Sequence, residues 1–319
     1  MSSLPKPDKN WSDERRSKWA VELSELGADE EEMQAIINDE FNTNYRSIGG
    51  IVGDIAGSRH EFNNTKSKEF ELLADNCYIT DDSVLTIATM KALLDGGTAK
   101  HFAESYRTLA KSHIFTKDLT GRSYGTGYGA GFFRWLMTED GQPYNSFGNG
   151  SAMRVSPVAW FYDDLDDVER VAEVSASVSH NHPEGIKGAK SVAGAILLAR
   201  MGKDKPSIKK YVEQRYGYDL NFTLDEIRDT YEHSEASQNT VPQAIVAFLE
   251  GKDFEDVIRN AISIGGDSDT ISAIAGSIAE AFYGVPNHIH KRTLQYVPEH
   301  LLEVVVGFNE TIRARSSAE

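Results

Sequence analysis

The chain has 319 residues, of which 40% are hydrophobic and 26% are charged. This is the composition of an ordinary globular protein that can bury a sizeable core in one large domain or in two, and it excludes collagen-like, low-complexity and wholly disordered classes. Acidic residues outnumber basic residues by 49 to 33, which gives a formal net charge of −16. Such a chain repels nucleic acid and anionic membrane, so we expect neither as a partner.

Cysteine usage and the lengths of the apolar stretches indicate the compartment. Cys77 is the only cysteine, so the chain cannot form an internal disulfide or a site with several thiolate ligands. The first residues lack the apolar core of a signal peptide, and the longest apolar stretch, 193–199, is far shorter than the roughly 20 residues of a membrane span. We therefore expect a cytoplasmic protein.

Helical periodicity recurs along almost the whole chain, and strand-type alternation is nowhere sustained. The sequence therefore predicts an all-α fold. Segments rich in Ala, Gly and Ser, such as 188–200 and 271–283, allow close approach of helix axes and are expected to be central. The predicted helices are 16–26, 29–41, 82–94, 132–136, 167–178, 188–200, 208–214, 241–249, 254–264, 271–283 and 301–312.

The segment 1–46 differs from the rest because it is highly charged and contains Pro5 and Pro7. Its two predicted helices carry apolar stripes, for example Trp19, Leu23 and Leu26, which are larger than a simple tail requires. We expect a lid or a partner-binding module, while docking of both helices on the main domain is the alternative. The main domain is placed at 47–319.

Two acidic motifs, TDDS at 80–83 and GGDSDT at 265–270, each stand immediately before a predicted helix. Helix capping alone explains one carboxylate or hydroxyl at such a position, and Thr270 is available as a cap. Each motif offers more than a cap needs, and if the two met in space a cation would have to offset their repulsion. Oxygen ligands of this kind suit Mg²⁺, Mn²⁺ or Ca²⁺.

Four further motifs each have a structural and a functional interpretation. In GDIAGSRHEF at 53–62, the glycine spacing favours close helix packing, and Glu61 is either a surface residue or part of a site. The glycine-rich run at 121–131 is either an anion cradle or a flexible connection. FGNGSAMR at 147–154 is a turn leading into a buried segment, and SHNHP at 179–183 contains either a metal-binding histidine pair or a satisfied histidine near a helix end.

Taken together and in this order, GDIAGSRHEF, TDDS, GTGYGAG, FGNGSAMR, SHNHPEG and GGDSDT resemble the ADP-ribosylglycohydrolase family over residues 47 to the C-terminus. The resemblance implies a compact multi-helix all-α globule with two divalent cations, Mg²⁺ or Mn²⁺, at the base of a cleft. It also implies hydrolysis of the bond between ADP-ribose and a modified protein side chain.

The resemblance implies a role for each residue of this sequence that matches a motif of the family. Ser83 and Ser268 depart mildly from the usual pattern without removing a ligand. Proton transfer is assigned either to a metal-bridging carboxylate or to Glu61. The implied catalytic residues are Glu61, Asp81 and Asp267; the implied metal ligands are Thr80, Asp81, Asp82, Asp267, Asp269 and Thr270; and the implied substrate-binding residues are Gly127, Tyr128, Gly129, Ser146, Phe147, Gly148, Asn149, Gly150 and His180.

The activity expected from these assignments is removal of ADP-ribose from modified arginine, with serine as the other modified residue considered. An immunity role against an ADP-ribosyltransferase toxin, contacted through residues 1–46, is a further expectation. Two alternatives remain open at this point. A metal-dependent phosphoesterase would release AMP instead of intact ADP-ribose, and a non-catalytic ADP-ribose-binding or structural protein would release neither.

Overall fold

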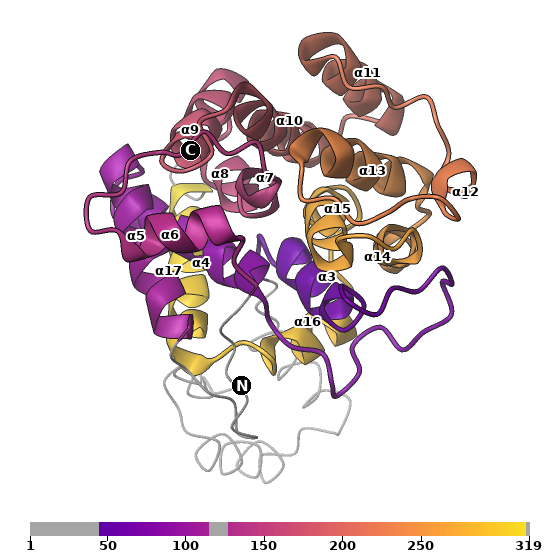
Figure 1. Cartoon of the computed structure of the whole chain (residues 1–319), viewed down its shortest axis with the longest axis horizontal. Helices are drawn as coiled ribbons and strands as arrows, with labels where there is room; N and C mark the ends of the chain where they lie inside the picture. The colour runs from indigo at the N-terminus through magenta and orange to yellow at the C-terminus, as the bar shows by residue number, and fades with distance from the viewer. Residues whose placement is uncertain (1–44, 115–126, 317–319) are drawn as a thin grey trace, which may run out of the picture. The chain divides into compact units, whose positions relative to one another are not determined.

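A computed structural model describes residues 45–114 and 127–316 of the chain. Within these ranges the chain forms helices and no β-strand, and one isolated bridge joins Gly148 to Ala236. The helices, shown in Figure 1, are α3 Gly49–Ser58, α4 Asp81–Leu94, α5 Ala99–Ile114, α6 Ala130–Met137, α7 Gly150–Met153, α8 Ser156–Phe161, α9 Leu165–Ser177, α10 Pro183–Arg200, α11 Lys205–Tyr216, α12 Leu224–Ile227, α13 Ser237–Glu250, α14 Phe254–Ser263, α15 Ser268–Tyr283, α16 Asn287–Leu294 and α17 Glu299–Ser316.

The all-α prediction is confirmed. The predicted segments 82–94, 188–200 and 271–283 lie within α4, α10 and α15. The structure adds α5, α7, α8, α12 and α16, which were not predicted. The predicted helices at 16–26 and 29–41 lie outside the described residues.

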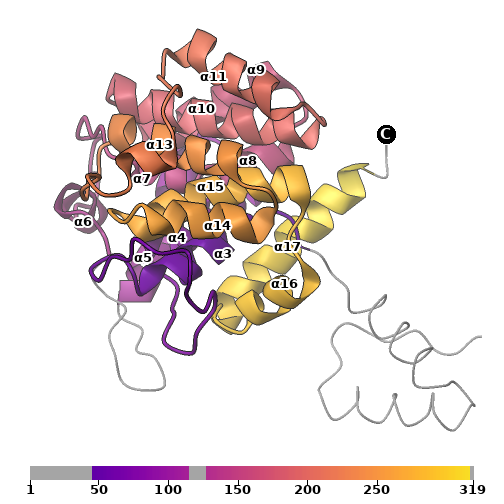
Figure 2. The ribbon, with the colours of Figure 1, turned by 90° about the vertical axis from the view of Figure 1, so that its right-hand side faces the viewer.

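The centre of the fold is the pair formed by α3 and α15, which the side view in Figure 2 shows surrounded by other helices. Every residue of α3 is buried. A Cβ added at Gly53 would stand 2.0 Å from the carbonyl oxygen of Ser272, and one added at Gly57 would stand 2.5 Å from Cα of Asp269. The glycine spacing therefore brings the two backbones into direct contact, as the sequence predicted.

Other helices pack around this pair: α10, α13 and α14 against α15, and α4 and α16 against α3. The helix α4 packs between α3, α5 and α17, while α10 packs against α9 and α15. Several of these helices start at a side-chain cap, for example Asp164 for α9 and Asp253 for α14, each of which accepts hydrogen bonding from backbone N–H of the first turn. The arrangement leaves the N-terminal ends of α4 and α15 side by side near the end of α3.

None of the described helices combines the length and the apolar character that a bilayer crossing requires.

Candidate functional site

The foundation of the site is Asp54, a fully buried carboxylate on α3. Its Oδ2 accepts bonds from the backbone N–H of Thr80 at 2.9 Å and of Ser83 at 3.0 Å, and its Oδ1 accepts one from Thr80 Oγ1 at 2.6 Å. The hydroxyl of Ser83 also donates to Oδ2. Asp54 thus fixes the turn that begins α4, although the sequence analysis did not select it.

The start of α4 presents two carboxylates. Thr80 is the N-cap, and its hydroxyl accepts the backbone N–H of Asp82 at 3.3 Å, while Asp81 and Asp82 occupy the first turn. Oδ1 of Asp82 is buried and has no hydrogen-bond partner among the described residues. Oδ2 of the same side chain accepts a bond from Thr270 Oγ1 at 3.3 Å, which joins this helix start to that of α15.

The start of α15 differs in one respect from the sequence prediction. Gly265 and Gly266, with φ of +70° and +75°, turn the chain so that the helix begins at Ser268. Asp267 occupies the N-cap position without a capping bond. The prediction of Thr270 as the available cap was therefore wrong, because the helix has already begun two residues earlier. The Thr270 hydroxyl instead reaches across to Asp82.

The three segments together form an acidic cluster. Carboxylate oxygens of Asp54, Asp82 and Asp269 lie within 4.8 Å of one another, and so do those of Glu61, Asp267 and Asp269. Asp267 Oδ2 accepts a bond from Asn149 Nδ2 at 2.7 Å. Asp269 belongs to both groups, so the cluster is continuous.

The electrostatics of the cluster oppose ionisation in the absence of a cation. Burial, followed by the charges of the neighbouring acids, raises the pKa of Asp81 to about 7 and that of Glu61 to about 8. Burial raises the pKa of Asp54 to about 6 although four hydrogen bonds favour its charged form. The same causes raise the pKa values of Asp82 and Asp269 well above the usual range.

These properties fit a hard divalent cation. The available ligand atoms are carboxylate and hydroxyl oxygens, which hard cations prefer. Oδ1 of Asp82 is buried without a hydrogen-bond partner among the described residues, and a bound cation would satisfy it. A bound cation would offset the mutual repulsion that raises the pKa values. The cluster is therefore suited to metal binding.

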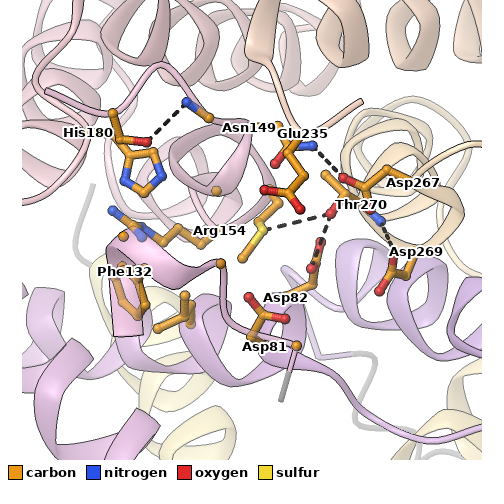
Figure 3. Close-up of a pocket in the computed structure, with 18 of the residues that line it drawn as sticks. Asp81, Asp82, Phe132, Asn149, Arg154, His180, Glu235, Asp267, Asp269 and Thr270 are labelled. Carbon is orange, nitrogen blue, oxygen red and sulfur yellow. Dashed lines mark hydrogen bonds between the residues drawn. The ribbon is translucent and has the colours of Figure 1, made fainter. Parts of the chain in front are cut away.

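A pocket opens over the acidic cluster (Figure 3). Of the predicted site residues, Thr80, Tyr128 and Phe147 do not line it. Tyr128 is only 8% exposed and stacks on Phe132 with 5.5 Å between ring centroids, while Phe147 is 50% exposed and stands edge-on to His182. The predicted residues that do line it are Glu61, Asp81, Asp82, Gly127, Gly129, Ser146, Gly148, Asn149, Gly150, His180, Asp267, Asp269 and Thr270.

Several lining residues were not predicted from the sequence. Arg154 and Phe132 lie beside His180 at the end of the pocket away from the acids, and Glu235 lies near Asp267 (Figure 3). Of the two histidines in SHNHP, His182 caps α10 through its Nδ1, which accepts the N–H of Glu184 at 3.1 Å. The interpretation of a metal-binding histidine pair is therefore not supported.

Comparison with known proteins identifies the family. The sequence pattern of the family described as ADP-ribosylglycohydrolase matches residues 47–316. The chain belongs to this family. As an ADP-ribosylglycohydrolase it is an enzyme that hydrolyses glycosidic linkages of ADP-ribose, which confirms the predicted enzyme class.

Individual relatives of this ADP-ribosylglycohydrolase agree with the assignment. ADP-ribosylhydrolase ARH3 of Mus musculus is 27% identical over 82% of this chain and 87% of its own length, and the Homo sapiens protein is 25% identical over 82% and 88%. ADP-ribosylarginine hydrolase Tri1 of Pseudomonas putida is 28% identical over 43% of this chain and 39% of its own. A solved structure titled ADP-ribosylglycohydrolase-related protein complex shares the fold, with a TM-score of 0.60 at 23% identity over 83% of this chain and 95% of that one.

Proposed function

We propose that this enzyme uses two divalent cations, Mg²⁺ or Mn²⁺, to hydrolyse the N-glycosidic bond between ADP-ribose and arginine side chains of modified proteins. The observation that carries the proposal is the convergence of carboxylates from α3, α4 and α15 in one cluster, of which Asp82 and Asp269 line the pocket, with Oδ1 of Asp82 left without a partner among the described residues. Paired cations held by oxygen ligands are suited to hydrolytic chemistry at neutral pH.

The proposed metal ligands are the acids and hydroxyls of the two helix starts. When bound, the cations supply positive charge that polarises water and orients hydroxyl groups of the substrate. Asp54 positions the first start through its bonds to Thr80 and Ser83. The proposed ligands are Thr80, Asp81, Asp82, Asp267, Asp269 and Thr270.

The acidic rim of the pocket favours a cationic leaving group. Glu61 and Glu235 both line the pocket, and the side chain of Glu235 is 70% exposed. Two carboxylates at an opening can hold a guanidinium, which presents several N–H donors, more effectively than they can hold a serine hydroxyl. The Pseudomonas putida relative is named an ADP-ribosylarginine hydrolase, which supports the same substrate.

Proton transfer to the leaving group is assigned to Glu61 or to a metal-bridging carboxylate such as Asp81 or Asp267. Glu61 is the only one of the three outside the two helix starts, and the charges of the other two are among the causes that raise its pKa to about 8. A carboxyl group that keeps its proton near neutral pH can act as a general acid.

The remaining part of the pocket is proposed to bind the diphosphate and riboses. Gly129 leaves open space in front of its backbone, because a Cβ there would meet nothing nearer than Glu235 Oε2 at 3.6 Å. Backbone N–H groups near such glycines can approach phosphate oxygens closely. The proposed substrate-binding residues are those that line the pocket, Gly127, Gly129, Ser146, Gly148, Asn149, Gly150 and His180, together with Tyr128 and Phe147, which are their neighbours in the chain but do not line it.

Product analysis tests the proposal. Proteins carrying ADP-ribose on arginine or on serine are incubated with the enzyme, with magnesium or with EDTA, and the products are separated by chromatography. We expect intact ADP-ribose from the arginine-modified protein in magnesium only. Release of AMP would indicate a phosphoesterase, release from serine alone would overturn the arginine assignment, and full activity in EDTA would overturn the metal assignment.

An immunity role is proposed as the biological setting. The enzyme would reverse modification by an ADP-ribosyltransferase toxin in the cytoplasm, and residues 1–46 would contact the toxin. Two features support the idea. The predicted helices of that segment carry apolar stripes, and removal of ADP-ribose from arginine would reverse the modification that such a toxin makes. A truncation experiment, given in the Discussion, tests the contact.

A further inference from the structure

Arg154 is a buried cation at the end of the pocket opposite the acids. It is fully buried, its guanidinium stacks on Tyr106 at 4.2 Å, and no described carboxylate forms an ion pair with it. Its Nε and Nη1 have no hydrogen-bond partner among the described residues. A buried arginine in this state is costly, so its position calls for a physical explanation.

The polar partners of this guanidinium lead to the pocket. Nη2 of Arg154 donates to Ser179 Oγ at 2.9 Å, and the same oxygen lies 2.8 Å from Nδ1 of His180. Ser179 is fully buried, and its side chain has no other hydrogen-bond partner among the described residues. A guanidinium can only donate, so Ser179 Oγ accepts from Arg154 and its own proton remains available.

This order of donation decides the state of the imidazole. If Nδ1 of His180 accepts the Ser179 proton, the Ser179 hydroxyl both accepts from Arg154 Nη2 and donates to the ring, so neither of its roles is left unfilled. If Nδ1 carried a proton instead, the buried Ser179 hydroxyl would have no acceptor, which is unfavourable. The doubly protonated ring is opposed by burial and by the charge of Arg154, which hold the pKa of His180 well below its usual range.

We propose that Arg154 and Ser179 are positioning residues that hold His180 in the neutral form with its proton on Nε2, where the ring offers that proton to an oxygen of the bound ligand. Nε2 faces the glycine turn that lines the pocket, since it lies 3.0 Å from where a Cβ at Gly150 would stand. No described residue hydrogen-bonds to Nε2. That the acceptor belongs to ADP-ribose rests on the proposed function.

No acid of the described residues is among the causes that shift the pKa of His180. The groups that face it are Arg154 and Tyr144, whose ring stands edge-on at 5.9 Å, together with the apolar ring of Phe132 at 6.4 Å. A donor that is neutral and fixed recognises a phosphate or ribose oxygen without taking up a proton. The two ends of the pocket therefore differ in charge: one end carries the acidic cluster, and the other carries the N–H donor of His180 with the Arg154 guanidinium behind it.

The tautomer itself is measured by NMR on the full chain labelled with ¹⁵N-histidine, in magnesium. We expect His180 to show an unprotonated Nδ1 and a protonated Nε2 throughout the range from about pH 5 to about pH 8. Ser179→Ala should increase the population with a proton on Nδ1, and Ser179→Thr, which keeps the hydroxyl, should restore the original signals. A protonated Nδ1 in the unmodified protein, or identical signals in Ser179→Ala, would overturn the proposal.

Calorimetry with ADP-ribose gives the functional consequence. We expect Ser179→Ala and Arg154→Met to bind about tenfold more weakly, because each removes one link in the hydrogen-bonded chain. Ser175→Ala is the matched control: it removes another buried hydroxyl, which lies in α9 and is hydrogen-bonded to Tyr106 at 2.9 Å. It keeps the Ser175 carbonyl that accepts from Arg154 Nη2 and leaves the Ser179–His180 contact intact, so both its signals and its affinity should be unchanged.

These experiments distinguish a failure of the proposed function from a failure of the His180 assignment. If the unmodified protein does not bind ADP-ribose, the proposed function is wrong, and the NMR signals still decide the tautomer. If it binds ADP-ribose and Ser179→Ala binds with equal affinity, His180 is not held for the ligand by this chain of bonds. Equal weakening in Ser179→Ala and the Ser175→Ala control would mean that both changes act only through packing, and this too overturns the proposal.

Discussion

Replacing Asp267 by Asn tests whether the acidic helix starts hold cations. The change is nearly isosteric, and the amide oxygen can still accept the 2.7 Å bond from Asn149 Nδ2. The fold should therefore survive, while one charged ligand disappears. Because the Asp267 charge is among the causes that raise the pKa values of Glu61 and Asp81, the metal-free variant should be at least as stable as the original protein.

The magnitude follows from mass action. A cation present at about 100 times its Kd stabilises the folded state by about 2.7 kcal/mol for each ion bound. In a domain of this size, about 1 kcal/mol changes Tm by about 2 °C, so each ion should raise Tm by roughly 5 °C. Asp267→Asn should lose most of this rise and most of the hydrolytic activity.

The assay is thermal unfolding across a magnesium titration, with Asp140→Asn as the control. Asp140 is an exposed acid outside the cluster, so its variant should keep the full magnesium response. An unchanged magnesium-dependent Tm rise in Asp267→Asn would refute the ligand assignment. A loss in both variants would show that the response is a general effect of charge.

Three further predictions concern pH, the glycine loop and the N-terminal segment. In the folded, metal-free protein the pKa of Asp81 is about 7 and that of Glu61 about 8, compared with ordinary pKa values of 3.8 and 4.5. The folded state therefore holds these protons more tightly than the unfolded state does. The contribution of these two groups to stability in EDTA should be greatest below about pH 4 and should fall as the pH rises to about 8. A Tm in EDTA that rises over this range would contradict the raised pKa values. Gly129→Ala should weaken ADP-ribose binding in calorimetry while the magnesium-dependent Tm rise stays intact, since a Cβ there meets no metal-site atom; equal affinity would mean that the loop is only a connection. Deletion of 1–44 should leave hydrolysis nearly unchanged and weaken association with a cognate ADP-ribosyltransferase in a pull-down assay, and a stable, active truncation that binds with full affinity would exclude the partner role.

The truncation begins after residue 44 for a structural reason. The backbone N–H of Tyr45 donates to His290 Nε2 at 3.0 Å, and that of Arg46 donates to Asn309 Oδ1 at 2.5 Å. Removing these two residues would disturb α16 and α17. Aggregation or a much lower Tm of the shortened protein would support docking of the segment on the main domain instead.

The helices could largely be predicted because their apolar residues repeat with the helical period. The helix α5 was missed although Phe102, Tyr106 and Leu109 form its buried stripe; here the signal was present in the sequence and was overlooked. The helices α8 and α16 have only six and eight residues, which is too short for the period to stand out. The start of α15 was misplaced because the turn at two glycines with positive φ cannot be located from composition alone.

The site was predicted unevenly for a similar reason. Acids in excess of a cap's needs identified both helix starts, but Asp54 was read only as part of a packing motif. Its signal was that of a single charged residue in an otherwise uncharged helix of small and apolar residues, which implies a buried carboxylate with dedicated partners. Arg154 gave the same signal after Ala152 and Met153, whereas its distance from any acid could be known only from the structure.

The close contact between α3 and α15 also bears on how rigid the proposed metal site is. Gly53 and Gly57 bring the backbones so close that neither helix can slide without collision, and Asp54 and Asp269 are carried by these same helices. We therefore expect a rigid site that selects a cation by ionic radius: Mg²⁺ requires oxygens at about 2.0–2.1 Å, whereas Ca²⁺, at about 2.3–2.6 Å and with more ligands, would have to spread packed helices. On this expectation, the choice between the two ions depends on two glycines that contribute no ligand atom.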